Sequence, residues 1–554
     1  MKYNGAEILI KLLENQGVEY IAGIPGGFNL PIYDALYNSK IKHILTRHEQ
    51  GAGFIAQGIS RSSDKVGVCL ATSGPGATNL LTAIADAKLD SIPLIAITGQ
   101  VPYSAIGTDA FQEVDAYGLT IPITKHNFII RKIDDLFYVL PEAFKIAKEG
   151  RPGPVVIDFP KNIQSEVIDL KEFPKPIEDI KTKQTLNSSD LSYIGHQINK
   201  ARRPIIYAGG GIINSHASDD LYKLAKKNNI PVALTLMGLG SFPADDQLYV
   251  GMLGMHGAPF TNLLINEADL ILAFGVRFDD RATGDIKKFS PKASIIHIDI
   301  DESEINKVRN SSVSLNCDIG IFLRSIIDFV EENSRSNWVN RINCFKNKYP
   351  LPSYDDSIHP ANLIPFIASI IPDDSIIVTD VGEHQMWTAQ RYPFKQPKTL
   401  LTSGGLGTMG FGLPAAIGAS LYNKDKLIIS FSGDGSILMN IQELATLSEL
   451  QANVKILIMN NHHLGLVRQQ QNLFYNNHFI ASEFICNPDF KAIAEGFGLK
   501  GYDLTNAENP LDTLKELLST KGPAVINIPI NDKENIYPMV APGAGNTEMI
   551  GGTD

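Results

Sequence analysis

Short apolar runs alternate with amphipathic segments along almost the whole of this 554-residue chain. The runs suit strands that are buried on both faces of a sheet, and the segments between many of them have helical spacing. The alternation therefore predicts α/β domains with parallel sheets covered by helices on both faces. The expected strands are residues 67–71, 94–98, 155–159, 205–208, 270–274, 295–300, 376–379, 427–430, 456–460 and 524–529.

Two polar stretches divide this pattern into three parts. Residues 163–189 are rich in Pro, Lys, Glu and Asp, with Pro174 and Pro176 close together, and residues 333–360 end in a group of prolines. Both are expected to be linkers, and residues 543–547 are expected to form a mobile tail or lid. The prediction is three doubly wound domains of ordinary size, at 1–165, 185–340 and 355–554.

Composition and charge exclude several classes of protein. The net charge of -11 argues against a nucleic-acid partner and against an anionic membrane surface. The four cysteines are widely separated, which predicts neither a metal cluster nor a disulfide framework and favours the reducing cytoplasm. No apolar run approaches the roughly 18 residues of a membrane span, and no signal peptide is expected at the N-terminus.

A glycine-flanked acid and a later asparagine predict a cation site. Gly433-Asp434-Gly435-Ser436 follows one apolar run, and Asn461 follows the next. A strand–helix–strand crossover brings successive strand ends to one sheet edge, where a carboxylate and an amide oxygen can bind Mg²⁺. The glycines let backbone N–H groups approach a diphosphate. Alone, Gly-Asp-Gly is equally typical of an ordinary turn, and the asparagine pair at 460–461 favours the cofactor site.

The two motifs together resemble the signature of thiamine-diphosphate enzymes. The resemblance implies that Asp434, Asn461 and the backbone carbonyl of His463 hold Mg²⁺, and that Met409 lies beneath the organic cofactor. Glu383 departs from the family, which usually has Gln there, and a carboxylate beside a diphosphate is repulsive unless it is protonated or turned away. The implied contacts to thiamine diphosphate are Glu49, Glu383, His384, Gln385, Gly407, Met409, Gly433, Gly435, Ser436 and His463.

Glu49 is the expected proton-transfer residue. It begins a helical stretch, where a glutamate by itself is more simply a favourable partner for the helix dipole. The resemblance implies that it hydrogen-bonds the aminopyrimidine ring of the cofactor and acts there in general acid–base catalysis. Gly27, Phe111 and Gln112 are the other catalytic residues that the resemblance implies. Phe28 replaces a residue that is usually small, and its ring is expected to narrow the substrate entrance.

A further set of motifs, in order along nearly the whole chain, resembles acetohydroxyacid synthase. Arg277-Phe278-Asp279-Asp280-Arg281 discriminates best, although a salt-bridged surface turn would also explain it. In that family the arginine pair helps to hold FAD, and arginine forks and glycine runs suit a pyrophosphate. The implied FAD contacts are Arg151, Gly209, Gly210, Gly211, Thr235, Leu236, Met255, His256, Arg277, Arg281, Asp299 and Asp318.

The resemblance implies a catalytic subunit that decarboxylates pyruvate and joins the two-carbon fragment to pyruvate or 2-oxobutyrate. The products would be 2-acetolactate and 2-aceto-2-hydroxybutyrate, precursors of branched-chain amino acids. Gln470, where many members have Trp, is typical of the bacterial isozyme I type. The implied partners are a second copy in a homodimer or homotetramer and a separate small regulatory subunit. A catabolic acetolactate synthase, a pyruvate oxidase and a non-catalytic FAD-binding paralogue remain alternatives, and intact Glu49 disfavours a glyoxylate carboligase.

Overall fold

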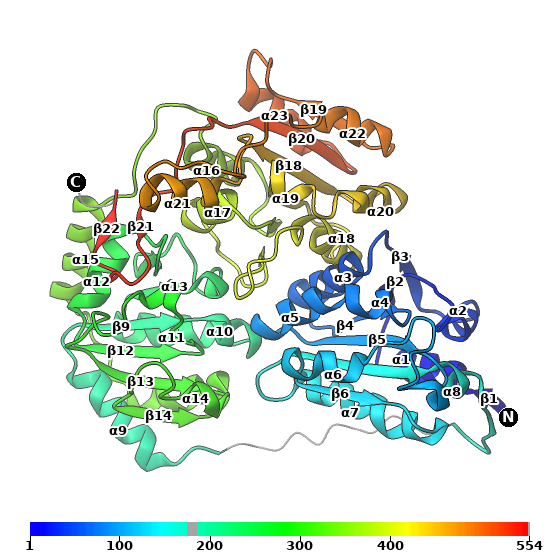
Figure 1. The fold of residues 1–554 in the computed structure, drawn as a ribbon. Coiled ribbons are helices and arrows are strands. Elements are labelled where there is room, and N and C mark those ends of the chain that lie inside the picture. The colour runs from blue at the N-terminus through cyan, green and yellow to red at the C-terminus, as the bar shows by residue number, and fades with distance from the viewer. Residues whose placement is uncertain (174–184, 552–554) are drawn as a thin grey trace.

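A computed structural model describes residues 1–173 and 185–551, so Pro174 and Pro176 lie outside the described residues. Three α/β units lie side by side, each built on a six-stranded parallel sheet (Figure 1). In the described part of the chain, no helix is long and apolar enough to cross a membrane. The predicted fold class, three parallel-sheet α/β domains, is confirmed.

The N-terminal sheet has the order β3-β2-β4-β5-β7-β6. Alternate residues of its central strands point to opposite faces, as strand geometry requires. Val68 and Leu70 pack under α1 (Gly5–Asn15) and α7 (Leu136–Lys148), whereas Cys69 and Ala71 pack under α3 (Glu49–Ser62) and α5 (Leu81–Leu89). The strands are β2 (Tyr20–Gly23), β3 (Lys42–Leu45), β4 (Gly67–Ala71), β5 (Leu94–Gln100), β6 (His126–Ile129) and β7 (Pro154–Pro160).

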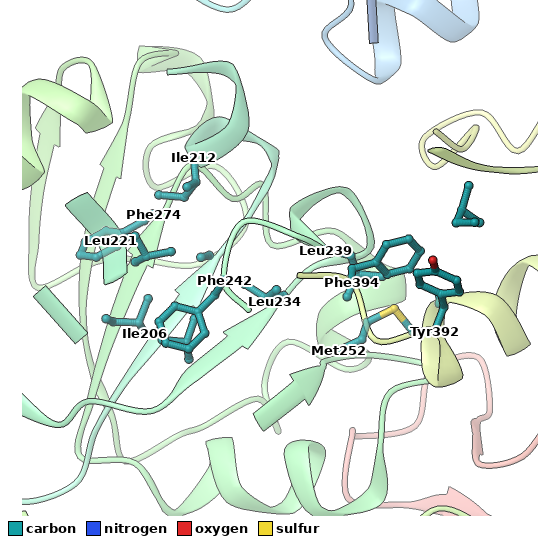
Figure 2. Packing of buried hydrophobic residues seen from close by; sticks show 14 of the residues in the cluster. Ile206, Ile212, Leu221, Leu234, Leu239, Phe242, Met252, Phe274, Tyr392 and Phe394 are labelled. Atoms are coloured by element: carbon teal, nitrogen blue, oxygen red, sulfur yellow. The ribbon is translucent and has the colours of Figure 1, made fainter. Parts of the chain in front are cut away.

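The central sheet has the order β11-β10-β9-β12-β13-β14. One face packs against α9 (Ser188–Lys200), α11 (Ser218–Asn228) and α14 (Ile319–Ile326), and the other against α12 (Pro259–Glu267). The hydrophobic core on the face covered by α9, α11 and α14 continues past Phe242 to Tyr392 and Phe394 of the C-terminal unit (Figure 2). The strands are β9 (Pro204–Ala208), β10 (Val232–Leu234), β11 (Tyr249–Met252), β12 (Leu270–Phe274), β13 (Ser294–Asp299) and β14 (Val313–Asn316).

The C-terminal sheet has the order β16-β15-β17-β18-β20-β19. One face is covered by α16 (Pro360–Ile370), α17 (Glu383–Arg391) and α23 (Pro510–Ser519), and the other by α18 (Gly412–Tyr422), α20 (Leu444–Leu450) and α22 (Phe490–Gly496). Because α18 also packs against α3, the N- and C-terminal units share a core. The strands are β15 (Ile376–Thr379), β16 (Leu400–Leu401), β17 (Ile428–Gly433), β18 (Val454–Asn460), β19 (Lys500–Asp503) and β20 (Ala524–Pro529).

Two segments expected to be irregular have defined structure. Residues 333–360 contain α15 (Ser336–Lys348), because Trp338, Ile342 and Phe345 form an apolar stripe that packs on the central unit. The expected tail folds back as a hairpin of β21 (Met539–Val540) and β22 (Met549–Ile550). Between these strands, buried Asn546 donates to the Ala282 carbonyl, which anchors the segment on the central unit (Figure 1).

Candidate functional site

Two of the three proposed metal ligands, the side chains of Asp434 and Asn461, follow neighbouring strands. Asp434 is the first residue after β17 and Asn461 the first after β18, and these strands pair in parallel with Gly433 opposite Met459. The crossover expected from the sequence therefore brings both side chains to one sheet edge. Among the described residues, no group of three or more His, Cys, Asp or Glu side chains could hold a metal ion. One carboxylate and one amide fit Mg²⁺, which takes few protein ligands.

Asn487 is a site residue that the sequence did not reveal. Its amide Nδ2 donates to Asp434 Oδ2 at 2.6 Å and to Asn460 Oδ1 at 2.9 Å. Burial raises the pKa of the Asp434 carboxyl, and the hydrogen bond from Asn487 opposes that rise. Asn487 has no local sequence signal, because it reaches the site from a loop beyond α21 (Gly465–Phe474).

Glu383 turns one carboxyl oxygen toward Asn461, a proposed metal ligand. Asn461 Nδ2 donates to Glu383 Oε2 at 3.2 Å, while Oε1 is buried with no partner among the described residues. Burial raises the pKa of Glu383 to about 8, against the opposing effect of Arg468. A raised pKa favours the protonated carboxyl, and protonation would reduce the repulsion expected between a carboxylate and a diphosphate.

The start of the β17–α19 turn and His384 form a polar cradle. α19 (Asp434–Ile437) begins directly after Gly433, and Ser436 Oγ accepts from the Gly433 N–H at 3.0 Å. Burial lowers the pKa of His384 to about 3, so the ring is neutral, and its Nε2 has no partner in the described residues. A Cβ on Gly433 would stand 3.1 Å from His384 Nδ1, so glycine keeps this approach open. A neutral imidazole beside a glycine-flanked turn, where the backbone can be approached closely, suits a diphosphate.

The loop with Gly407 and Met409 leads into α18 and is held by aspartates. Asp380 accepts from the N–H groups of Gly410 and Gly412, at 2.8 and 3.2 Å. Gly407 and Gly410 have φ of +70° and +89°, which only glycine adopts without strain. Gln385 donates through Nε2 to the Ser403 carbonyl at 3.0 Å. Gln385 and Gly407 both line one cavity, which is described below.

Glu49 begins α3 at the edge of the N-terminal sheet. The half-buried side chain accepts from Asn79 Nδ2 at 2.9 Å, and its Oε1 would lie 3.4 Å from a Cβ on Gly76. The turn before it is held by Glu443 of the C-terminal unit, whose Oε1 accepts from the N–H groups of Arg47 and His48 at 2.9 and 3.0 Å. Glu443 is fully buried, and sequence patterns gave no indication of this role.

Phe111 and Gln112 lie on an exposed loop near that edge. Gln112 has a φ of +61°, and its backbone would contact a Cβ on Gly74. The Glu113 carboxylate accepts from the N–H groups of Gly107, Thr108 and Ala110, and these bonds lower its pKa. The loop therefore has a defined shape that leaves the Phe111 side chain 81% exposed.

Gly27 is also exposed, with nothing within 4 Å of a Cβ built on it. The half-buried ring of Phe28 lies next to it, with Lys161 Nζ at 5.8 Å from its centroid. Neither Gly27 nor Glu49, Phe111 or Gln112 lines the large cavity of the chain. Within one chain, the four proposed catalytic residues and the FAD-type motifs thus occupy separate places.

The large cavity, of about 910 Å³, lies between the three units. The FAD contacts expected from the sequence line it, except Gly209, which precedes Gly210 and leaves no room for a Cβ beside the Gly275 carbonyl. Gln385, Gly407 and Gln470 also line this cavity, so it adjoins the proposed diphosphate side. The expected residues on its wall are Arg151, Gly210, Gly211, Thr235, Leu236, Met255, His256, Arg277, Arg281, Asp299 and Asp318.

Arg151 on this wall forms ion pairs with neighbouring acidic side chains. Arg151 Nη1 pairs with Asp301 at 3.1 Å and with Glu304 at 2.8 Å. Burial raises the pKa of Asp299 to about 6. A long cavity with arginines, glycines and acids suits a dinucleotide, because pyrophosphate needs donors and close backbone approach, and ribose hydroxyls need acceptors.

Comparison with known proteins agrees with this geometry. The N-terminal TPP binding domain, the central domain and the C-terminal TPP binding domain of the thiamine pyrophosphate enzymes match residues 3–119, 192–326 and 380–528. The chain is 51% identical to the acetolactate synthase isozyme 1 large subunit of Escherichia coli, over 99% of this chain and 98% of the relative.

Two further relatives extend the likeness. The isozyme 2 large subunit of Escherichia coli is 42% identical over 99% of both chains. The chloroplastic acetolactate synthase of Arabidopsis thaliana is 42% identical over 99% of this chain and 84% of its own length. These matches cover all three units, including the FAD-type motifs and the Asp434–Asn461 pair. The chain therefore belongs to the family of acetolactate synthase large subunits, within the thiamine pyrophosphate enzymes.

Proposed function

We propose that this chain decarboxylates pyruvate and transfers the two-carbon fragment to pyruvate or 2-oxobutyrate. The products are 2-acetolactate and 2-aceto-2-hydroxybutyrate, as branched-chain amino-acid biosynthesis requires. The observation that carries the proposal is the whole-length similarity to acetolactate synthase large subunits with Glu49, Asp434 and Asn461 in place. A non-catalytic paralogue would have no need to keep this set.

Asp434, Asn461 and the His463 carbonyl would hold Mg²⁺, and the cradle of His384, Gly433, Gly435 and Ser436 would hold the diphosphate. Thiamine diphosphate, when bound, supplies an electron sink for the carbon–carbon bond that breaks. The His384 ring is neutral and its Nε2 is buried without a partner among the described residues, so this nitrogen is available to a bound group. Asn487, which donates to Asp434 Oδ2, would help to hold this carboxylate in place when the ion binds.

Glu49 would hold and move a proton at the aminopyrimidine ring. Asn79 fixes its Oε2, which leaves Oε1 toward Gly76 as the oxygen that can meet a ligand. Since Glu49 and the Asp434 site belong to different units, we propose that the active site forms between two copies, with Glu49 from one and Asp434 from the other. Phe111 and Gln112, which are exposed or half-buried in one chain, would then meet the reacting groups of the second copy.

The large cavity would hold FAD, with Arg151, Arg277 and Arg281 toward its pyrophosphate. The flavin would serve a structural role, because the proposed reaction has no net redox change. A separate small regulatory subunit, as the words "large subunit" in the relatives' names suggest, is the proposed partner. The proposed location is the cytoplasm.

The experiment is an assay for acetolactate from pyruvate with the purified chain, with and without thiamine diphosphate and Mg²⁺. Visible flavin absorbance of the same preparation distinguishes the proposal from a flavin-free catabolic synthase. Acetyl phosphate and hydrogen peroxide, in place of acetolactate, would indicate a pyruvate oxidase. Absence of every product with all three cofactors bound would favour the non-catalytic paralogue. Titration with the small subunit should raise turnover and create sensitivity to valine.

A further inference from the structure

The loop 403–408 is attached to the rest of the molecule by side chains rather than by backbone pairing. Gly404, Gly405 and Gly407 are exposed, and within the described part of the chain no backbone–backbone hydrogen bond involves residues 403–408. Yet this loop leads directly to Met409 and forms part of the wall of the large cavity. Its position therefore depends on whatever side chains hold it.

Two aspartates at the end of α5 hold the loop. Asp90 Oδ1 accepts from the Gly405 N–H at 2.7 Å, and Oδ2 accepts from the Gly404 N–H at 3.0 Å. Asp86 Oδ1 accepts from the hydroxyls of Ser403 and Thr408, the latter at 3.1 Å. Both aspartate side chains are completely buried. All four donors belong to the loop, so α5 is its principal anchor.

Arg61 of α3 sets the charge of this cluster. Its Nη2 donates to Asp86 at 3.1 Å and to Asp90 at 2.8 Å, and its Nη1 donates to the Thr402 carbonyl at 2.8 Å. One guanidinium faces two carboxylates, so the remaining negative charge is directed at the loop N–H groups. Hydrogen bonds to a charged acceptor are the strong ones, which suits a loop whose backbone forms no backbone–backbone hydrogen bond among the described residues.

The same end of α5 also contacts the FAD-type motif. The Leu89 carbonyl accepts from Arg277 Nη1 at 3.0 Å, one residue before Asp90. Leu89, Asp90 and residues 403–407 all line the large cavity. The α5 end is thus held between an arginine that faces the proposed flavin and the loop that approaches the proposed thiamine diphosphate.

We propose that Asp90, assisted by Asp86, is a positioning residue that couples the two cofactor sites. Flavin in the cavity holds Arg277 and the α5 end in place, and Asp90 transmits that order to loop 403–408. Thiamine diphosphate then binds to a loop that is already in position, so less ordering has to accompany its binding. This inference rests on the proposed function for the identity of both ligands.

The test is a calorimetric titration of the full chain, freed of cofactors, with thiamine diphosphate and Mg²⁺, in the absence and presence of saturating FAD. FAD should tighten thiamine diphosphate binding to the native chain by roughly tenfold, within the usual range of coupling between sites. In Asp90→Asn, the amide oxygen can keep one of the two loop N–H groups as a neutral acceptor, while the other N–H group faces the NH2 group, so affinity should fall by about tenfold. The FAD effect on thiamine diphosphate binding should fall to less than about twofold, and a direct flavin titration of the variant shows that FAD is bound.

Asp158→Asn is the matched control. Asp158 is equally buried but accepts from Thr98 and Gln100 inside the N-terminal sheet, at 2.7 and 2.9 Å. This variant should keep both the native affinity for thiamine diphosphate and the native FAD effect. Thermal unfolding of each variant shows whether it is folded. If Asp90→Asn does not fold, Thr408→Val, which removes a donor on the half-exposed loop, should weaken thiamine diphosphate binding by about threefold.

Several results would overturn the coupling. The coupling is excluded if folded Asp90→Asn binds thiamine diphosphate with native affinity and shows a native FAD effect. If Asp90→Asn does not fold, the same result for Thr408→Val excludes the coupling. A native chain that binds both cofactors without any effect of one on the other would also exclude it, while the proposed function would stand. If FAD does not bind the native chain at all, a direct flavin titration shows this, and both the coupling and the flavin part of the proposed function fail.

Discussion

Removal of the Glu443 carboxylate tests how the C-terminal unit positions Glu49 within one chain. In Glu443→Ala, the part-buried N–H groups of Arg47 and His48 lose their acceptor. A fully buried donor without a partner costs about 1–3 kcal/mol, so these two donors together cost up to about 6 kcal/mol, and the turn shifts to find new partners. A displacement of about 1 Å at a catalytic residue lowers the rate by roughly 100-fold. We therefore expect kcat to fall about 100-fold with the fold retained.

Two variants separate position from charge. In Glu443→Gln, Oε1 can keep both N–H groups and Nε2 can donate to Thr446 Oγ1, which lies 2.7 Å from Glu443 Oε2. This variant should keep activity within about threefold of native, because only charge is lost. Glu449→Ala removes the exposed carboxylate that pairs with the Arg47 side chain and should have little effect. Acetolactate formation at saturating cofactors is the assay. A folded Glu443→Ala chain with kcat within threefold of native would refute the positioning role.

The remaining predictions concern four other side chains. Glu49→Gln should stay folded and lose most acetolactate activity, since an amide cannot exchange the proton; near-native turnover would exclude Glu49 from proton transfer. Asp434→Ala should weaken Mg²⁺ and thiamine diphosphate binding together in calorimetry, and unchanged affinity for either would place the metal elsewhere. Gln470→Trp should favour 2-oxobutyrate over pyruvate by about tenfold in a competition assay, because a flat ring contacts the extra methyl group; an unchanged product ratio contradicts this. Burial raises the pKa of Asp158 to about 7 in the folded chain. At a pH between the unfolded and the folded pKa, the folded chain binds this proton and the unfolded chain does not. The free energy of unfolding therefore decreases with rising pH, by up to about 1.4 kcal/mol per pH unit. In Asp158→Asn the thermal midpoint should fall less steeply from pH 5 to 7, and equal slopes would show that Asp158 does not titrate there.

Hydrophobic periodicity was enough to predict the centre of each sheet. The ten expected strands correspond to β4, β5, β7, β9, β12, β13, β15, β17, β18 and β20. These strands are covered on both faces, so most of their positions are apolar, and that requirement is visible in the sequence. The proximity of Asp434 and Asn461 at one sheet edge was predictable for a related reason, because a crossover between two such strands leaves little freedom in where their ends lie.

Short strands at or near the sheet edges were not predictable in this way. β6, β14, β16 and β19 have two to four residues and lie at edges, where fewer neighbours demand apolar side chains. α15 was also missed, because its apolar stripe is interrupted by many polar residues and becomes meaningful only against the central unit. In each case burial by a distant segment, rather than local pattern, decides the structure.

The positioning residues around the site were decided by tertiary structure alone. Glu443 reaches the turn before Glu49, Asn487 reaches Asp434, and Asp90 reaches loop 403–408. Each bond joins segments that are remote in sequence, and a single acid or amide in a polar stretch has no pattern that names its partner. The protonation of Glu383 likewise depends on burial, which only the packed fold provides. The sequence by itself determined the chemical groups of the site, and the packing of the three units determined which groups hold them in place.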